Sequence, residues 1–211
     1  MLDLQSYGPG GRVSTGLLAW YQGRLVWALG HQKYWETRPE GTIIPVVGIG
    51  GWQEPGETLI GAVRRQALEE TGARAIPVHA PWTLWCRGED EASRVELDNE
   101  ALDGEQAPLL VWQQQVTLRR DDSASYQRDY INAVYEAVLV DNPQASAEVP
   151  GLLFTEARVF QGLGVEPVPL EKLLADGVDY HGAALPPGVR LRLQGSARYL
   201  ARFWGELPGW R

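Results

Sequence analysis

Apolar positions along the chain fall into short stretches whose lengths suit β-strands. Residues 13–29 contain two such stretches on either side of Gln22 and Gly23, a pattern typical of a β-hairpin. Residues 42–49 are rich in β-branched side chains and predict another strand, in which Pro45 indicates an edge position or a bulge. Further strands are expected at residues 75–78, 82–87, 109–118 and 130–140.

Helical periodicity is present in three segments. The first, about residues 57–71, has apolar residues at helical spacing and is followed by Gly72, a residue type favoured just after the last turn. Residues 169–177 begin with proline and end with glycine, which predicts a short helix. Residues 196–207 place aromatic and aliphatic side chains on one side and predict an amphipathic helix. Strands mixed with helices in this way predict a single α/β or α+β layered domain.

Composition narrows the classes of function. The chain has 211 residues and a net charge of −8, which disfavours nucleic acid or an anionic membrane as its main partner. One cysteine, Cys86, and three scattered histidines exclude an internal disulfide and a Cys/His zinc site. Cys86 is expected to be a buried small hydrophobe, with a nucleophile as the alternative. No apolar run suits a bilayer span and residues 1–10 lack signal-peptide features, so a cytoplasmic location is expected.

We expect residues 1–211 to form one domain with its core at about 12–178. Residues 88–107 are rich in acids and predict a solvated loop, with a functional acidic lid as the alternative. Residues 189–207 are expected to be a C-terminal extension whose apolar helix side packs on the core or forms a dimer surface. Most of the nine tryptophans are expected to fill the core or to pack against loops, and one or two to stack on a ligand.

The segment Gly51–Ala73 combines a glycine turn with a helix that ends in acidic residues. Gln66, Glu69 and Glu70 are spaced to lie on one helix face. Adjacent carboxylates repel, and the helix dipole disfavours them near a C-terminal end. A divalent cation between them explains the arrangement, since Mg²⁺ takes oxygen ligands completed by water and phosphate. The alternative is a solvated acidic helix end, stabilised by an Arg65–Glu69 pair.

These residues resemble the Nudix box, Gly-x5-Glu-x7-Arg-Glu-U-x-Glu-Glu-x-Gly-U, where U is a bulky aliphatic residue. The matching positions are Gly51, Glu57, Arg65, Glu69, Glu70 and Gly72. The resemblance implies a Nudix-type α/β/α sandwich with a mixed sheet, here with an extra C-terminal helix. It also implies hydrolysis of the pyrophosphate in a nucleoside diphosphate linked to another moiety, with Mg²⁺ or Mn²⁺ as cofactor.

The resemblance also implies roles for individual residues. Glu69, Glu70 and the carbonyl of Gly50 would be metal ligands, while Glu57 and Arg65 would support the geometry of the box. The implied catalytic set is Glu57, Arg65, Gln66, Glu69 and Glu70. The candidates for substrate binding are Trp20, Tyr34 and Trp52, as stacking side chains, together with Glu156 as the nearest acid to a loop that often supplies a further carboxylate.

One departure from the family pattern affects the chemistry. Gln66 stands where the family has glutamate, and an amide cannot usefully accept a proton near neutral pH. Gln161 aligns with the position of the loop acid, and Ala67 and Ala73 stand where bulky aliphatic residues are usual. The alternative to a hydrolase is therefore a weakened Nudix-fold module that binds or senses a nucleotide.

The expected partner is a small nucleoside diphosphate derivative, with no nucleic acid and no membrane, and a homodimer is possible. A third hypothesis is an interaction protein that uses residues 88–107 and 196–207 as contact surfaces.

Overall fold

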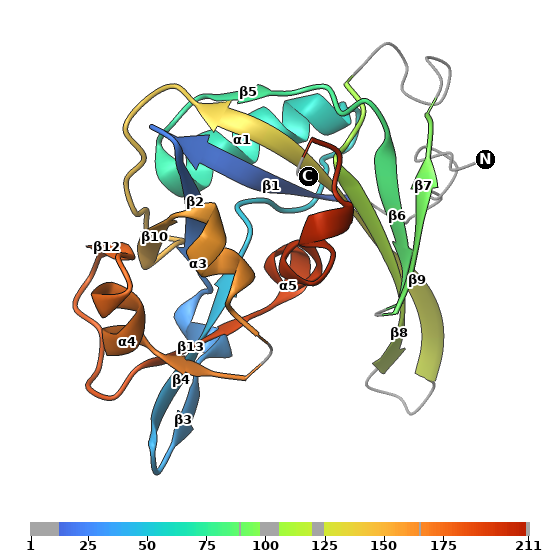
Figure 1. The fold of residues 1–211 in the computed structure, drawn as a ribbon. Helices are drawn as coiled ribbons and strands as arrows, with labels where there is room; N and C mark the ends of the chain where they lie inside the picture. The colour runs from blue at the N-terminus through green and yellow to red at the C-terminus, as the bar shows by residue number, and fades with distance from the viewer. Residues whose placement is uncertain (1–12, 89, 98–105, 120–124, 165, 210–211) are drawn as a thin grey trace.

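The computed structural model describes residues 13–88, 90–97, 106–119, 125–164 and 166–209, and within these residues thirteen strands form one sheet (Figure 1). The strands are β1 (Ser14–Tyr21), β2 (Arg24–Leu29), β3 (Glu36–Arg38), β4 (Gly41–Val47), β5 (Ala75–Pro77), β6 (Thr83–Arg87), β7 (Glu91–Val95), β8 (Leu110–Arg119), β9 (Ser125–Leu139), β10 (Gly151–Thr155), β11 (Val168–Pro169), β12 (Asp179–Gly182) and β13 (Arg190–Leu193). The helices are α1 (Leu59–Thr71), α3 (Ala157–Gln161), α4 (Leu170–Ala175) and α5 (Gly195–Arg202), with 3₁₀ turns η1 (Gln32–Tyr34) and η2 (Trp204–Glu206).

The sheet is mixed. Its longest path runs β11-β13-β4-β2-β1-β9-β8-β6-β7, with β3 paired to β4, β5 to β9, and β10 to both β2 and β12. Three pairs are parallel, namely β1 with β9, β13 with β4, and β6 with β8, while the other pairs are antiparallel. The predicted α/β class with a mixed sheet is confirmed.

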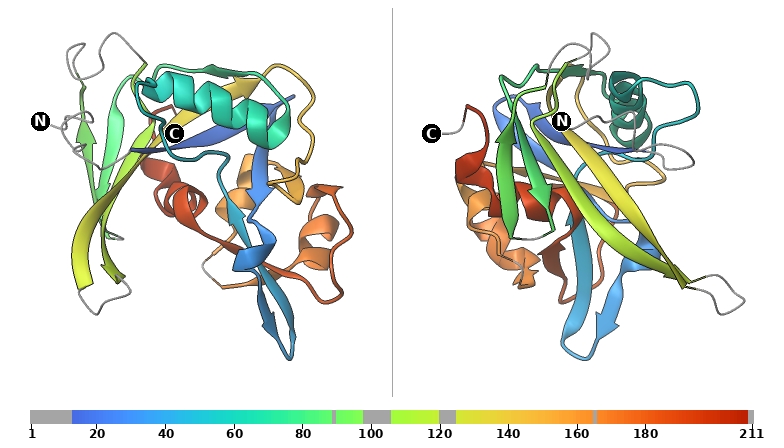
Figure 2. Two further views of the ribbon diagram at one scale, coloured as in Figure 1. Left: turned by 180° about the vertical axis from the view of Figure 1, so that it is seen from behind. Right: turned by 90° about the vertical axis from the view of Figure 1, so that its right-hand side faces the viewer.

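Helices cover both faces of the sheet (Figure 2). On β1, Leu17 belongs to the core cluster that contains the buried side chains of α1, while Leu18 belongs to the cluster that contains those of α3, α4 and α5. Successive residues alternate in this way because neighbouring side chains of a strand point to opposite faces. The sheet therefore separates two hydrophobic cores, and α1 lies on one side with the other three helices opposite.

The predicted hairpin is confirmed, because β1 and β2 are antiparallel and Tyr21 faces Arg24 across the turn. Gln22 and Gly23 both have positive φ, at 49° and 78°, as the tight turns of hairpins require. The expectation of an edge position or a bulge at Pro45 is corrected. β4 is an interior strand, and Pro45 lies between its stretch paired with β3 and its stretch paired with β2, where a missing N–H costs little.

The acidic segment and the C-terminal segment also differ from expectation. Part of the expected loop 88–107 is the strand β7, an edge strand beside β6; residues 89 and 98–105 lie outside the described part. Edge strands are commonly charged, so a charged strand resembles a loop in sequence. Within the expected extension 189–207, β13 pairs with both β4 and β11 inside the sheet.

The expected helix over 196–207 is shorter. α5 ends at Arg202 and η2 follows, and Leu207 is extended before Pro208, which disfavours helical geometry in the residue that precedes it. The aromatic side of α5 packs in the core, since Tyr199 and Leu200 are buried there. Core packing therefore accounts for this apolar side.

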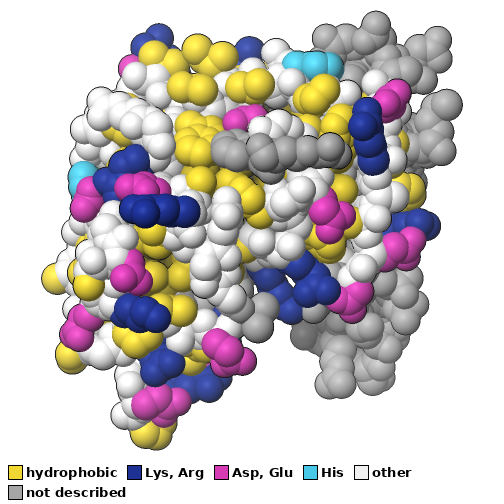
Figure 3. Space-filling view, in the orientation of Figure 1, with side chains coloured by type: hydrophobic (Ala, Val, Ile, Leu, Met, Phe, Trp, Pro, Cys, Tyr) yellow, Lys and Arg dark blue, Asp and Glu magenta, His cyan; other side chains and the backbone are white. Residues whose placement is uncertain are grey.

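Exposed apolar side chains gather along one part of the surface. Ile76 of β5 faces Val138 of β9 in the register, and both are about half exposed. Figure 3 shows hydrophobic side chains along the upper edge of the molecule, where β5 lies. Among the described residues, no helix has the length and apolar character needed to span a membrane.

Candidate functional site

The helix α1 has a well-defined start and end. The Thr58 hydroxyl accepts a hydrogen bond from the Gly61 N–H (3.0 Å), which caps the first turn. Gly72 adopts a left-handed conformation (φ 66°), and its N–H bonds to the Leu68 carbonyl. The helix buries Ile60, Val63 and Ala67 against the sheet, so its other side is left to present polar groups.

Arg65 joins three parts of the Gly51–Ala73 segment. Its guanidinium donates two hydrogen bonds to the Glu57 carboxylate (2.9 and 2.8 Å), in a bidentate pair. It also donates to Glu69 (3.0 Å) and to the Trp52 carbonyl (3.0 Å). The Arg65 hydrogen bonds are the main reason that the pKa of Glu57 lies below its ordinary value, with a backbone bond from Glu54 adding to the effect. One side chain thus holds the turn before α1 against the helix.

Glu70 is a buried carboxylate at the end of α1. Only 8% of the residue is exposed, and the Gly50 N–H donates to its Oε1 (3.2 Å). Burial raises the pKa of Glu70 to about 8, against the lowering effect of the Gly50 bond, and the carboxylates of Glu148 and Glu69 raise it further. Because burial disfavours the ionised form of this carboxylate, a cation bound next to it would stabilise that form.

The Gly50–Gly51 loop fits tightly between β1 and α1. A Cβ at Gly50, whose φ is 153°, would lie 2.1 Å from the Thr15 carbonyl oxygen, and one at Gly51 would lie 2.6 Å from the Gln66 amide. Only glycine fits at position 50, where the clash is with backbone, whereas a side chain at position 51 would have to displace the Gln66 amide. The carbonyls on either side of Gly50 accept hydrogen bonds from β1, Ile49 from Leu17 and Gly51 from Thr15 (2.8 Å each). The Gly50 carbonyl thus lies between two peptide groups that are anchored to the sheet.

The Gln66 side chain packs between this loop and the carboxylates. In the orientation that satisfies its neighbours, its amide nitrogen donates to Glu70 Oε1 (3.1 Å) and its oxygen accepts from Arg65 (2.6 Å). The structure therefore brings together Glu57, Arg65, Gln66, Glu69 and Glu70 around the Gly50–Gly51 loop. Glu69 is more exposed than Glu70, and its carboxylate contacts Arg65.

The candidate stacking residues lie in different places. Trp52 belongs to the box loop, is 44% exposed, and packs edge-on against Tyr130 (5.0 Å between ring centroids). Trp20 lies on β1 and donates from Nε1 to Glu136 (3.0 Å). Tyr34 lies in η1, with the Lys33 ammonium over its ring. Trp52 is thus the candidate that is tied to the box residues, because its backbone carbonyl accepts a hydrogen bond from Arg65.

One acid that acts on Glu70 was not indicated by the sequence pattern. Glu156 precedes α3 and pairs with Arg158 (2.6 Å), and Gln161 is the last residue of α3. Besides the neighbouring Glu69, the acid whose charge raises the pKa of Glu70 is Glu148, in the connection between β9 and β10. No local pattern distinguishes Glu148 from other acids, because its position depends on how the β9–β10 connection folds back toward the end of α1.

The oxygen donors near the end of α1 suit a hard cation that takes few of its ligands from the protein. The described part of the chain has no group of three or more His, Cys, Asp or Glu side chains placed to hold a metal ion. It has two adjacent carboxylates, of Glu69 and Glu70, and the Gly50 carbonyl. Mg²⁺ commonly uses one or two carboxylates, several waters and substrate phosphate oxygens. The donor set therefore fits Mg²⁺ or Mn²⁺ bound together with a phosphate compound.

Comparisons with known proteins bear on the fold. No family model and no curated protein matches this chain. It is similar to a NUDIX-family hydrolase from Clostridium perfringens (15% identity, 72% of this chain, 85% of that chain, TM-score 0.41). It is also similar to a MutT protein from Methanosarcina mazei (17%, 72% and 81%, TM-score 0.41) and to a MutT NUDIX hydrolase from Burkholderia pseudomallei (16%, 78% and 95%, TM-score 0.37). The functional argument therefore depends on the geometry of the site.

Proposed function

We propose that this chain is a Nudix-type hydrolase that cleaves the pyrophosphate of a nucleoside diphosphate linked to another moiety, with Mg²⁺ or Mn²⁺. The observation that supports the proposal is the Glu70 carboxylate, which is buried at the junction of α1 and the Gly50 loop with a raised pKa. Burial of a carboxylate without a cation costs free energy, and perturbed acids of this kind are common at functional sites.

The metal would be held by Glu70, Glu69 and the Gly50 carbonyl. When bound, such an ion neutralises charge on the phosphoryl oxygens. The chain's own residues fix the donors, because Arg65 holds Glu57, Glu69 and the Trp52 carbonyl in one arrangement. This preorganisation means that few side chains need to reorder when substrate binds.

A proton acceptor is needed for attack by water, and Gln66 cannot serve. Glu69 already accepts a hydrogen bond from Arg65, which occupies one of its two carboxylate oxygens. Glu148 is close enough to act electrostatically on Glu70 and is exposed. We therefore assign Glu148 as the candidate general base. Replacing Glu148 with Gln should lower the rate of hydrolysis and leave binding of the metal largely unchanged.

Trp52 is the candidate for stacking on the nucleobase or another planar part of the substrate. Its ring is held from one side by Tyr130 and its carbonyl by Arg65, while much of its surface is exposed. Trp20, Tyr34 and Glu156 remain candidates for other parts of the substrate. Replacing Trp52 with Leu should raise KM more than it lowers kcat.

The test is release of phosphate or nucleoside monophosphate from ADP-ribose, nucleotide sugars, dinucleoside polyphosphates and nucleoside triphosphates, with Mg²⁺ or Mn²⁺. We expect hydrolysis of at least one compound, and Glu70→Gln should lower it by about 10- to 100-fold, as loss of a metal ligand or its support does. The matched control is Glu40→Gln, an exposed acid in the turn between β3 and β4.

Metal binding gives a readout besides activity. Mn²⁺ should raise the Tm of the unmodified chain, since a ligand that binds only the folded state stabilises it. The shift should disappear in Glu70→Gln and persist in Glu40→Gln. Equal shifts in all three proteins would contradict the assigned metal site, and absence of turnover on every compound would contradict the hydrolase.

The second candidate function is nucleotide binding without turnover. The observation that favours it is the Gln66 amide, which hydrogen bonds to Glu70 where the family places a carboxylate. Gln66→Glu distinguishes the two functions. A large gain in rate from an inactive starting protein would support the binding module, whereas an unchanged rate would support a hydrolase whose base lies elsewhere.

A further inference from the structure

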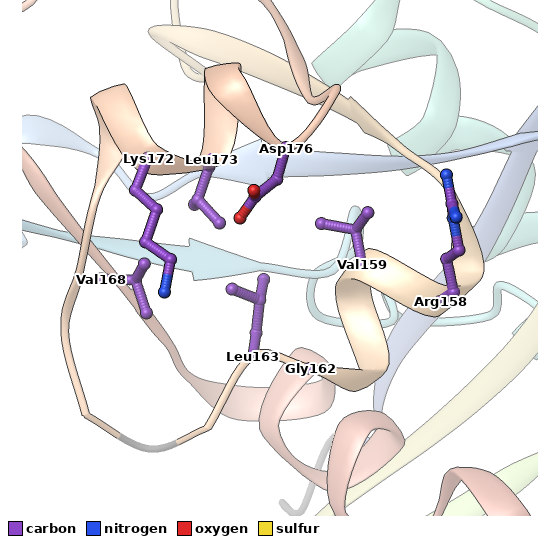
Figure 4. A pocket seen from close by; sticks show the side chains of 8 residues that line it. All are labelled: Arg158, Val159, Gly162, Leu163, Val168, Lys172, Leu173 and Asp176. Carbon is purple, nitrogen blue, oxygen red and sulfur yellow. The ribbon is translucent and has the colours of Figure 1, made fainter.

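A pocket lies between α3 and α4, on the face of the sheet opposite α1 (Figure 4). Its volume is about 410 Å³, within the range of small-molecule sites. The lining residues are Arg158, Val159, Gly162, Leu163, Val168, Lys172, Leu173 and Asp176. None of them belongs to the Gly50 loop or to α1, so the pocket is separate from the proposed hydrolase site.

The inner wall of the pocket is apolar. Val159 and Leu163 point from the α3 side toward α4, and Leu173 points back from α4 (Figure 4). Leu173 is buried in the core, and Val159, Leu163 and Val168 pack against that core while remaining partly exposed. Half-exposed aliphatic side chains of this kind can bury further area against the apolar part of a ligand.

Two opposite charges stand beside this wall. Lys172 and Asp176 are four residues apart on one side of α4 and its C-cap, and both side chains line the pocket (Figure 4). They do not pair with each other, and neither forms an ion pair with any residue that the structure describes. In a helix, an ion pair at this spacing is more favourable when the acid precedes the lysine, and here the lysine comes first. Both groups are therefore available to a ligand.

The third charged residue is already paired. Arg158 donates from Nε to the Glu156 carboxylate at 2.6 Å, so its guanidinium already has a carboxylate partner within the chain. The free groups of the pocket are thus one cation and one anion beside an aliphatic wall. Charge complementarity favours a ligand that has both signs, since an anion alone would meet Asp176 and a cation alone would meet Lys172.

We propose that this pocket binds a small zwitterion with an apolar side chain, of the kind that a free aliphatic amino acid presents. Its carboxylate contacts the Lys172 ammonium, its ammonium contacts the Asp176 carboxylate, and its side chain packs on Val159, Leu163 and Leu173. The proposal requires no metal and no turnover at the α1 site, so it stands or falls independently of the hydrolase.

Isothermal titration calorimetry tests the charge pattern with three probes that share one branched aliphatic chain: L-leucine, 4-methylpentanoate and isopentylamine. L-Leucine has both charges, the acid lacks the ammonium and the amine lacks the carboxylate. We expect saturable binding of L-leucine. Each truncated compound should bind at least about fivefold more weakly, because it lacks one partly exposed charged contact. No saturable binding of L-leucine, or equal binding of 4-methylpentanoate, would overturn the proposal.

Two substitutions locate the binding. Lys172→Gln should weaken the binding of L-leucine about fivefold and leave the binding of isopentylamine unchanged. Asp176→Asn should weaken the binding of L-leucine and leave the binding of 4-methylpentanoate unchanged. Both residues are exposed, so neither change should affect folding. Glu171→Gln, an exposed acid of α4 that does not line the pocket, is the matched control and should bind L-leucine normally. Unaltered L-leucine binding by both variants would place the ligand elsewhere and overturn the assignment.

Discussion

At the scale of single residues, the strongest constraint on the candidate site is geometric. Arg65 makes five hydrogen bonds to four groups, which are the carboxylates of Glu57 and Glu69, the Trp52 carbonyl and the Gln66 amide oxygen. A planar guanidinium can satisfy several acceptors at once, and an ammonium cannot match that fork. The choice of arginine at this position therefore follows from the arrangement of its acceptors as well as from charge.

Arg65→Lys should lower the free energy of unfolding by about 1 kcal/mol, because the bidentate pair with Glu57 becomes a single contact. Urea denaturation measures the change. Arg158→Lys is the control: Arg158 pairs with Glu156, both side chains are more than half exposed, and the effect should stay below about 0.5 kcal/mol. Equal effects of the two substitutions would show that Arg65 does not brace the segment.

Cys86 illustrates a residue whose chemistry is suppressed by its place in the fold. It is fully buried in β6, and burial raises the pKa of its thiol to about 12, with a smaller contribution from the Glu206 carboxylate. The expectation of a buried small hydrophobe is thus supported by its position, and the thiolate needed for nucleophilic reaction is disfavoured.

Alkylation of Cys86 by iodoacetamide at pH 8 should therefore be at least about 100-fold slower in the native protein than in urea. Mass spectrometry of timed samples measures the rate. The unfolded sample serves as the control, since its thiol has an ordinary pKa. Comparable rates in the two samples would contradict a buried, protonated thiol.

At the scale of elements, α1 was predicted well because its end depends on one residue. Gly72 has φ 66°, and a Cβ there would meet nothing within 4 Å. A substitution would thus test the left-handed conformation without a steric clash. Gly72→Ala should cost about 1 kcal/mol of stability, which is the penalty of this conformation for a residue with a Cβ.

The matched control for that prediction is Gly205→Ala. Gly205 also has open space around its Cβ position, but it lies in η2 without a positive φ. Its substitution should leave the free energy of unfolding unchanged or slightly higher, because alanine restricts the unfolded chain. If both variants lost the same stability, a general cost of alanine would explain the result better than the helix cap.

Elements with strong local patterns could be predicted from the sequence, and others could not. The β1–β2 hairpin and α1 each have a specific turn or cap residue and a clear periodicity. β7 has mixed and charged residues, and as an edge strand it depends on β6 for its conformation. Its pairing with β6 over five residues, and not its own sequence pattern, makes it a strand.

The candidate site was predictable in the same limited way. The spacing from Glu57 to Glu70 lies within one turn and one helix, so local geometry brings these residues together. Glu148 lies 78 positions beyond Glu70 in a connection without regular structure. The long-range pairing of β9 with β1 and β5 determines where that connection begins. No pattern within residues 142–150 encodes its distance from α1.

At the scale of the whole molecule, the sheet joins two cores, and the C-terminal segment belongs to one of them. β13 lies between β4 and β11, and Leu200 of α5 is fully buried in the same core cluster as Trp27 and Phe160, whose ring centroids are 4.1 Å apart in a stacked arrangement. The segment that looked like an extension in sequence is therefore part of the packed structure. Both cores share β1 and β2, so they should unfold together.

Leu200→Ala tests this dependence. Removing a fully buried leucine should lower the free energy of unfolding by about 3 kcal/mol, because the transfer free energy is lost and a cavity remains. Leu174→Ala on α4, where 43% of the leucine is exposed, should cost less than about 1 kcal/mol. Tryptophan fluorescence and far-ultraviolet circular dichroism should give one midpoint for each protein. Separate midpoints, with Leu200→Ala shifting only one of them, would show instead that the C-terminal segment packs as an independent unit on a core that is stable without it.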